Sequence, residues 1–318
     1  MSPATSPHRR PPLAAILLVP VAVAIILSLF AWPQARLEPR DVPIGVAGPP
    51  AGAAAIESKL AANDGAFEIH RYGTEAAARA AIEDRDVYGA FVATPSGPKV
   101  LIASAGSPAV AQALTHGAAE VDASVEDVVA STPAGGGLAA SILPLVLAGI
   151  LTGALSAGLA TGALKRTGLL LAGSVLAGLT GTAIVHGWLD VVGGDWLANA
   201  GVLSLTVFAI AATVAGLEAL LGKAGIALAA LTMILVGNPF SAVATGPEML
   251  PGPAGTLGQL LPPGAGGNLL RSTGFFDGAA AGSHVAVLVA WALFGLGALY
   301  LAALRNRRPA AAPVAVPA

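Results

Sequence analysis

Long runs of apolar residues, separated by short polar stretches, cover most of this chain. Six of these runs have about the 20 residues that a helix needs to cross the hydrocarbon core of a bilayer. The six runs are residues 13–32, 141–164, 168–188, 200–221, 224–244 and 284–304. The pattern therefore predicts an α-helical polytopic membrane protein with six transmembrane helices, one at the start and five in a domain over residues 141–304.

The first run follows a polar segment, residues 1–12, that contains Arg9 and Arg10. A cleaved signal peptide also has a basic start and an apolar core. The run over residues 13–32 is longer than a usual signal core, and no clean Ala-x-Ala cleavage site follows it before Pro33. We therefore interpret this run as an uncleaved membrane anchor.

Residues 33–140 differ from the apolar runs because they hold most of the Asp and Glu residues. Apolar alternation and turn residues predict strands at 42–46, 67–71, 88–94 and 99–104, and helices at 53–62, 75–83 and 107–129. Thr74 and Ser107 are expected to cap the last two helices. We expect a small extracytoplasmic α/β domain, inserted between the first two spans and joined to the second by a flexible link at 132–137.

The basic residues of the short connections indicate which side of the membrane faces the cytoplasm. With six spans, the cationic positions fall on one side: Arg9, Arg10, Lys165, Arg166, Lys223, Arg305, Arg307 and Arg308. The opposite connection, residues 190–199, carries two Asp and no cation. We therefore expect a multi-pass plasma-membrane protein with cytoplasmic tails at 1–12 and 305–318, and with the loop at 245–283 outside.

Composition agrees with a membrane protein, because 55% of the residues are hydrophobic and only 11% are charged, against about 25% charged in soluble domains. The chain has no cysteine, which excludes disulfides and thiol catalysis. The net charge of −2 gives no indication of nucleic acid, and we expect none as a partner.

Enzyme motifs are not met either. The Gly153–Gly158 stretch has the wrong spacing for G-x-S-x-G, and residues 216–223 have one residue too many for a phosphate-binding loop. His186 and His284 make a poor metal motif. We expect no ATPase, protease or metal site in this chain, and no cofactor.

Ionisable residues are scarce in the spans. Glu218 falls near the cytoplasmic end of its run, where we expect it to reach water. An ion-coupled proton relay is therefore not expected. Small residues recur at four-residue spacing, as at Gly149 and Gly153 and at Ala212 and Gly216. Such spacing predicts close helix packing, and we favour packing within the chain over a dimer face.

The stretch at 237–276 is rich in Pro and Gly and lies before the last run. Pro239 must break or kink a helix that reaches it, since proline lacks the backbone N–H. Backbone freed at membrane depth is tolerated only against protein or a water-filled cavity. We expect a re-entrant segment in which Asn268 starts a short interfacial helix and Arg271 is turned away from the apolar face. A plain external loop is the alternative.

The order of motifs in this stretch is Gly237-Asn238-Pro239-Phe240-Ser241, Leu250-Pro251, Leu261-Pro262-Pro263-Gly264-Ala265, Leu270-Arg271 and Phe275-Phe276. It is similar to the G-N-P-x-S, L-P, L-P-x-G-A, Arg and aromatic succession of some membrane permeases. Together with one anchor, an external insertion and five further spans, it resembles the type-2 ABC exporter permease superfamily, in particular the phage-infection-protein (YhgE/Pip-like) branch. The external part also matches that branch loosely, around Ala76, Tyr88 and Gly89.

The resemblance implies a permease that forms a dimer with a second copy or a related permease and exports a lipophilic or amphipathic substrate. It also implies contact with membrane lipid and a separate cytoplasmic ABC ATPase. It further implies that the segment before the last helix forms the external gate. The candidate gate residues are Asn238, Pro239, Ser241, Pro262, Gly264, Arg271 and Phe276.

One departure from the family concerns the ATPase. Such permeases dock their ATPase on a cytoplasmic helix between the second and third spans, whereas here we expect a link of about three residues, 165–167. Lys165 and Arg166 are the candidate contact with a cytoplasmic partner. The short link favours the alternative function, a membrane-anchored extracytoplasmic binding or scaffolding protein of the cell envelope without transport activity.

Overall fold

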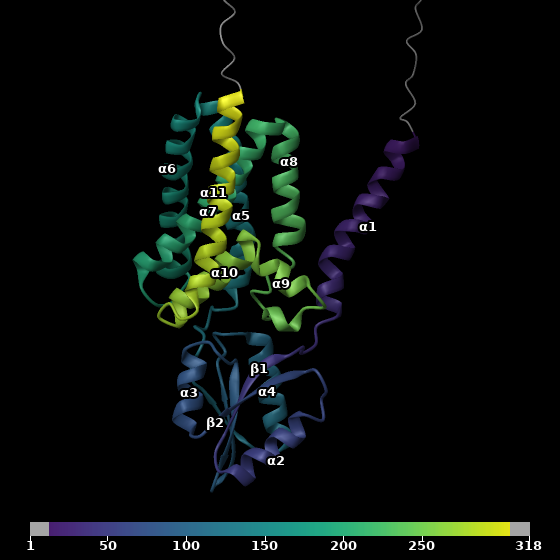
Figure 1. The fold of residues 1–318 in the computed structure, drawn as a ribbon, viewed down its shortest axis with the longest axis vertical. Coiled ribbons are helices and arrows are strands. Elements are labelled where there is room, and N and C mark those ends of the chain that lie inside the picture. Colours follow the sequence, from purple (N-terminus) through teal and green to yellow (C-terminus); the bar gives the residue numbers. More distant parts are fainter. Residues whose placement is uncertain (1–12, 306–318) are drawn as a thin grey trace, which may run out of the picture.

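The computed structural model describes residues 13–305, which form a helical bundle and an α/β domain stacked end to end (Figure 1). The predicted cytoplasmic tails at 1–12 and 306–318 lie outside the described residues. Arg305 is the last residue of the final helix.

Five helices in the described part of the chain are long and apolar enough to cross a membrane. The residues therefore form a mostly helical architecture compatible with a polytopic membrane protein, as the apolar pattern predicts. The long helices are α1 (Leu13–Ala35), α5 (Gly137–Leu159), α6 (Ala163–Thr182) with its π-helical extension η1 (Ala183–Trp188), α7 (Trp196–Leu221) and α11 (Ala281–Arg305).

The sixth predicted span, 224–244, is shorter than expected. It consists of α8 (Lys223–Leu231) and the π-helical η2 (Thr232–Gly237), which together make a shorter apolar helix. The helix ends before Pro239, where the missing N–H and the ring prevent a further turn. The apolar residues up to 244 instead belong to a segment that turns back toward the bundle.

The α6 start, the α7–α8 turn and the α11 end lie at the end of the bundle remote from the α/β domain (Figure 1). Lys165, Lys223 and Arg305 belong to these three places. Among the described residues, these predicted cytoplasmic cations thus lie at one end of the bundle.

Helix α7 is the centre of the bundle and packs against α5, α6 and α11. Small residues bring the backbones together, because a Cβ added at Gly295 would lie 2.4 Å from the Ala212 carbonyl oxygen. A Cβ at Gly216 would lie 2.2 Å from the Gly295 oxygen, and one at Gly153 would meet the Ala211 oxygen at 2.6 Å. The prediction of close packing within the chain is confirmed at these positions.

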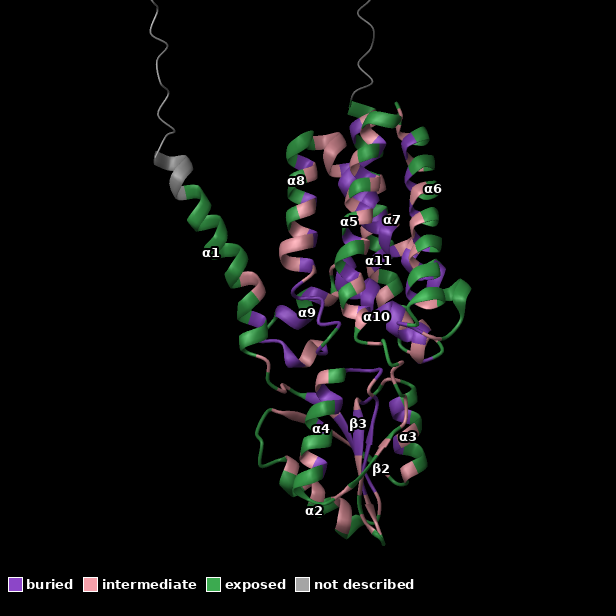
Figure 2. Cartoon of the chain, turned by 180° about the vertical axis from the view of Figure 1, so that it is seen from behind, coloured by how far each residue is buried: buried purple, intermediate pink, exposed green. Residues whose placement is uncertain are grey.

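Helix α1 stands apart from the bundle along most of its length (Figures 1 and 2). Large apolar side chains such as Leu18 and Leu27 are more than half exposed, as expected of a helix surrounded by lipid. At its domain-proximal end the Trp32 ring contacts Phe240 edge to face, at 6.5 Å between centroids. This contact anchors α1 to the segment that follows η2.

The α/β domain contains a five-stranded sheet of order β2-β1-β3-β4-β5. All its neighbouring strands are parallel except β3 and β4, which form a hairpin. In chain order the elements are β1 (Val42–Ala47), α2 (Pro50–Leu60), β2 (Phe67–Tyr72), α3 (Glu75–Glu83), β3 (Gly89–Thr94), β4 (Gly97–Ile102), α4 (Pro108–Glu120) and β5 (Ser124–Asp127).

Thr74 and Ser107 cap α3 and α4 as predicted, each accepting a hydrogen bond from a backbone N–H three residues later. The prediction that the last helix continues to 129 is wrong. Helix α4 ends at Glu120, Asp122 adopts a positive φ of 51°, and the chain then forms β5 beside β4.

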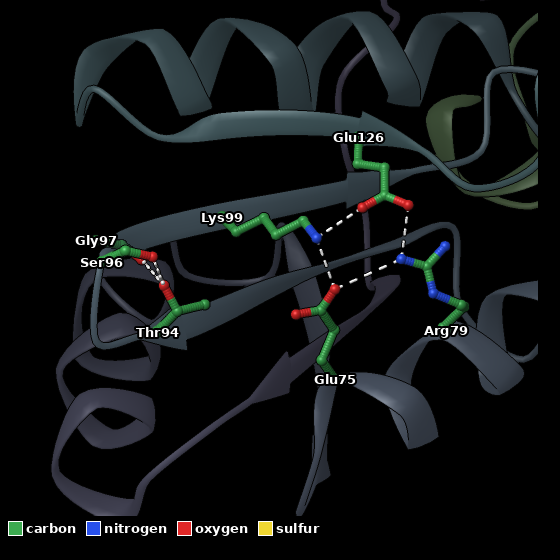
Figure 3. A network of polar contacts seen from close by, with 7 residues as sticks. All are labelled: Glu75, Arg79, Thr94, Ser96, Gly97, Lys99 and Glu126. Carbon is green, nitrogen blue, oxygen red and sulfur yellow. Dashed lines mark hydrogen bonds and ion pairs between the residues drawn. The ribbon is translucent and has the colours of Figure 1, made fainter.

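Strand β5 lies at the edge of the sheet and is attached to its neighbours by four charged side chains (Figure 3). Glu126 of β5 contacts Lys99 of β4 and Arg79 of α3, each at 2.6 Å. Lys99 also contacts Glu75, at 2.7 Å. These partly exposed pairs are individually weak, so their role here is to fix the position of a short polar strand.

The close contact between α7 and α11 predicts a sharp difference between two glycines of α11. Gly295→Ala places a methyl group against the α7 backbone and should lower the unfolding free energy by about 1–3 kcal/mol. Gly297→Ala is the matched control, because a Cβ there has no neighbour within 4 Å. Thermal unfolding in detergent measures both, and equal stabilities would contradict the contact.

Candidate functional site

The segment at 238–276, called here the fold-back segment, returns from η2 to the domain-facing end of the bundle. It contains η3 (Pro247–Met249), α9 (Ala254–Gln259) and α10 (Pro262–Phe275). Helix α10 is buried over most of its length and packs against α5, α7, α11 and η2. The segment is therefore an integral part of the bundle rather than a plain external loop.

Helix α10 begins earlier than predicted. Pro262 occupies its first turn, where a missing N–H leaves no carbonyl unpaired. Asn268, expected to cap the helix, lies in its interior. Glycines let α10 approach its neighbours, since a Cβ at Gly266 would lie 2.5 Å from the Thr206 side chain and one at Gly267 2.4 Å from Val243.

Arg271 is the centre of the contact between α10 and the α/β domain. Its side chain is buried, with the residue only 4% exposed, so the expectation that it is turned away from the apolar surroundings of the helix is wrong. Nε donates to the Ala105 carbonyl at 2.8 Å, and Nη1 donates to the Asn268 side-chain oxygen at 2.7 Å. Nη2 donates to the Val243 carbonyl. The guanidinium thus connects three separate segments.

No carboxylate among the described residues lies within salt-bridge distance of Arg271. Burial, and then the nearby charge of Arg85, lower the pKa of Arg271 to about 10. The group is therefore still charged at neutral pH, and the hydrogen bonds to carbonyl groups must replace the water it has lost.

Arg85 makes the opposite connection, from the α/β domain to α10. Its guanidinium donates to the Asn268 carbonyl at 3.2 Å and to the Ser272 hydroxyl. It also lies over the Phe276 ring, 5.2 Å from the centroid. Burial lowers the pKa of Arg85. Arg271 therefore reaches from α10 to the α/β domain, and Arg85 reaches from the α/β domain to α10.

Three further contacts hold η3 and the loop before it on the α/β domain. The Tyr88 hydroxyl donates to Glu248 at 2.8 Å, and the Ser107 hydroxyl donates to the Thr245 carbonyl at 2.7 Å. The backbone N–H of Arg40 donates to the Glu248 carbonyl at 3.0 Å. Burial and then the Glu248 carboxylate raise the pKa of Tyr88, which keeps the phenol protonated as a donor.

Asn268 links this interface to the start of the fold-back segment. Its amide donates to the Gln259 side chain at 2.7 Å, and the Gln259 amide donates to the Ser241 carbonyl at 2.9 Å. The Ser241 hydroxyl in turn donates to the Asn238 carbonyl at 2.8 Å. A continuous polar chain thus joins Arg271 to the turn after η2.

The structure brings the predicted gate residues into one region. Asn238, Ser241 and Arg271 belong to the polar chain, and Phe276 lies beneath Arg85. Other members act through backbone shape: Pro239 in the turn after η2, Pro262 at the start of α10, and Gly264 against the Gly258 carbonyl. Whether the region opens as a gate stays a prediction.

Sequence reasoning missed Arg85 and Glu248 as members of this region. Arg85 lies in a turn of the α/β domain, more than 180 residues from Asn268, and no pattern near it indicates a partner. Tyr88 entered only through the resemblance to permeases. The signal in the sequence is the isolated cation Arg271. A charged residue in an apolar segment needs polar partners, and looking for them would lead to these residues.

A groove between the two parts opens beside this interface. It has a volume of about 640 Å³ and is lined by Phe275, Phe276 and the acidic residues Glu83, Asp84 and Asp277, among others. A smaller cavity of about 90 Å³ lies next to Arg85, Tyr88 and Glu248. The interface is thus not packed solidly throughout.

The opposite end of the bundle holds the candidate partner contact. The α5–α6 link is 160–162, and Lys165 and Arg166 lie in the first turn of α6. Lys165 is exposed. Arg166 faces inward and pairs with Glu218 of α7 at 2.7 Å. Whether Lys165 and Arg166 contact a cytoplasmic partner stays a prediction. A cavity of about 970 Å³ borders both residues.

Comparison of the chain with models of known protein families, with curated proteins and with solved structures finds no match. The resemblance to permeases therefore rests on the chain's own motifs, chiefly those of the fold-back segment. The geometry of the interface carries the functional argument.

Removing the Arg271 guanidinium should loosen the interface from both sides. Arg271→Ala leaves the Ala105 and Val243 carbonyls unpaired, and Arg271→Lys cannot reproduce the planar set of donors. We expect each to cost about 3 kcal/mol of stability. Amide hydrogen exchange should accelerate in residues 103–107 and 243–249. Arg36→Ala, which removes an exposed cation, is the control, and unchanged exchange in the Arg271 variants would refute the assignment.

The raised pKa of Tyr88 predicts a dependence of stability on alkaline pH. The unfolded chain loses the phenol proton near pH 10 while the folded protein keeps it, so stability falls as pH rises above about 10. Tyr88→Phe should be less stable at neutral pH, because Glu248 loses its donor, yet show a shallower alkaline decline. Chemical unfolding across this range tests it, and parallel declines would contradict the prediction.

Proposed function

We propose that this chain is the permease-like subunit of a type-2 ABC exporter and moves a lipophilic or amphipathic substrate outward with a separate ATPase. The observation that carries the proposal is the fold-back segment. A buried helix before the last span is fastened to the α/β domain by Arg271 and Arg85. Such a segment can close one end of a bundle and open only when its polar contacts rearrange together.

The distribution of charge supports an apolar or amphipathic substrate. The five candidate spans contain only four charged residues, Lys165, Arg166, Glu218 and Arg305. All four lie near the end remote from the α/β domain, where Arg166 and Glu218 neutralise each other. His186 and His284 lie near the opposite ends of their spans, beside the α/β domain. A pathway through the middle of such a bundle therefore has no charged residues to form a proton relay.

The positive-inside rule supports the proposed orientation. It places the end with Lys165, Lys223 and Arg305 in the cytoplasm, and the α/β domain and the fold-back segment outside. Both termini are then cytoplasmic. The exposed apolar surface of α1 contacts lipid or a second permease in the proposed dimer.

The alternative is a membrane-anchored binding or scaffolding protein of the cell envelope. It is favoured by the α5–α6 link, which has only residues 160–162 and no helix on which an ATPase could dock. In this case, the cavity near Lys165 would have no partner, and the fold-back segment would be a fixed support of the α/β domain. Purification of the full chain distinguishes the two functions: an ATPase that co-purifies with it favours export, and absence of an ATPase favours the scaffolding function.

A disulfide that locks α10 to α7 tests the gate directly. The chain has no cysteine, so an introduced pair has no native thiols to compete with it. Gly266→Cys with Thr206→Cys joins α10 to α7, where the Cβ atoms would be 3.1 Å apart, slightly less than the usual distance. The control pair, Gly173→Cys with Thr152→Cys, joins α6 to α5 at a Cβ distance of 4.0 Å.

Cells with and without the gene are first compared for the amount of extracellular or outer-leaflet lipid and for resistance to an amphipathic drug. The quantity that differs between them is the readout. Oxidation of the α10–α7 pair should abolish this difference, and reduction should restore it. Oxidation of the control pair should leave it unchanged. Full export with a formed α10–α7 disulfide would overturn the gate and favour the scaffolding function.

A further inference from the structure

Helix α2 of the α/β domain is unusual because none of its residues is buried. A helix that covers a sheet normally buries one apolar stripe against it. The apolar residues of α2, Ile56 and Leu60, instead border an open slot between α2 and α4. The sheet beneath is therefore only partly covered on this face.

The two helices line the slot with matching stripes. Val110, Leu114 and Gly117 of α4 follow the spacing of one helical face, as do Ile56 and Leu60 of α2. Phe67 of β2 and Phe91 of β3 also line the slot and are only partly buried. The slot is thus lined by apolar residues of α2, of α4 and of the sheet.

The dimensions of the slot restrict what it can hold. Its volume is about 380 Å³. It follows α4 from Val110 to Glu120, a length of about 15 Å at the rise of an α-helix. An elongated apolar slot of this length and volume can hold one extended hydrocarbon chain.

Polar residues occur at the rim of the slot. Lys59, Asn63 and Glu120 are exposed and border the opening. They provide a cation, an amide and an anion where a polar head would reach water. At the side next to the bundle, Pro39 and Met249 complete the lining. The slot therefore has the polarity of an amphiphile with a single chain.

We propose that the slot between α2 and α4 binds the hydrocarbon chain of a single-chain amphiphile, a fatty acid or lysolipid, with its head beside Lys59, Asn63 and Glu120. This site lies apart from the Arg271 interface, although Met249 of the fold-back segment borders it, and the proposal goes beyond the export function. It assigns a lipid-binding role to the α/β domain whether or not the bundle transports.

Gly117 offers a way to fill the slot without disturbing the fold. A Cβ added there meets no atom within 4 Å, and replacing glycine in a helix interior favours the helix by up to about 1 kcal/mol. Gly117→Phe should therefore occupy the space of the chain. Ala113→Phe is a second filling variant, because Ala113 is exposed and also lines the slot.

The matched control is Ala119→Phe, the same substitution on the same helix at a residue that is exposed and outside the slot lining. The full-length protein in lipid nanodiscs is incubated with a fatty acid that carries a diazirine near the end of its chain, irradiated, and digested for mass spectrometry. Peptides of α2 and α4 should be labelled in the native protein and in Ala119→Phe. Both filling variants should lower this labelling by about tenfold.

Labelling of α11, which faces the bilayer, is the internal standard and should be equal in all four proteins. The assay does not depend on transport, so its failure is distinct from failure of the export function. Absence of label on α2 and α4 in the native protein would overturn the proposal. So would labelling that persists in both folded filling variants.

Discussion

The Arg271 guanidinium is a buried charge that has no carboxylate partner among the described residues. Taking such a group out of water costs several kcal/mol unless hydrogen bonds replace its hydration. Here the replacements come from Ala105 in the α/β domain, Val243 in the fold-back segment and Asn268 in α10. Because these acceptors lie in the α/β domain, at the start of the fold-back segment and in α10 itself, the charge is satisfied only when all three parts are in place.

This constraint makes the interface cooperative. Withdrawing the α/β domain removes the Ala105 carbonyl from Arg271 and, in the same movement, removes Arg85 from Asn268 and Ser272. Intermediate positions would leave the buried Arg271 and the partly buried Arg85 without some of their hydrogen-bond partners, which is more costly than either end state. An interface of this kind favours two discrete arrangements over a continuous range, as a gate requires.

The interface also depends on close approach of the α10 backbone to its neighbours. Gly264, Gly266 and Gly267 lie in the first half of α10, where added side chains would meet Gly258, Thr206 and Val243. Since the helix can approach its neighbours there, Arg271 is brought within reach of Ala105. The glycines therefore permit the close approach on which the hydrogen bonds of Arg271 depend.

The sequence was sufficient for features that depend on local pattern. Apolar runs and capping residues such as Thr74 and Ser107 predicted the long helices and most of the domain. Strand β5 was missed because its sequence, Ser-Val-Glu-Asp, has little apolar alternation and is held by pairing to β4 and by Arg79 and Lys99. The burial of Arg271 was missed because its acceptors are mostly backbone carbonyls, which leave no signature in residue types.

The run at 224–244 shows why apolar content alone overestimated a span. Phe240, Ala242 and Val243 are apolar because they are buried in the protein, and a hydropathy pattern does not distinguish protein from lipid as the surrounding medium. The turn at Asn238-Pro239 surrounds these residues with protein rather than lipid, because it redirects the chain toward the bundle. Length of an apolar run sets only the upper limit of a span.

The slot and the interface share one short segment, which has a thermodynamic consequence. Met249 lines the slot, and the adjacent Glu248 binds Tyr88 and Arg40 at the interface. A hydrocarbon chain in the slot that favours one position of Met249 must therefore favour the corresponding arrangement of the fold-back segment. By linkage, rearrangement of that segment changes the affinity of the slot by the same factor. If the slot binds lipid and the fold-back segment is a gate, as proposed, the α/β domain takes part in gating in response to lipid.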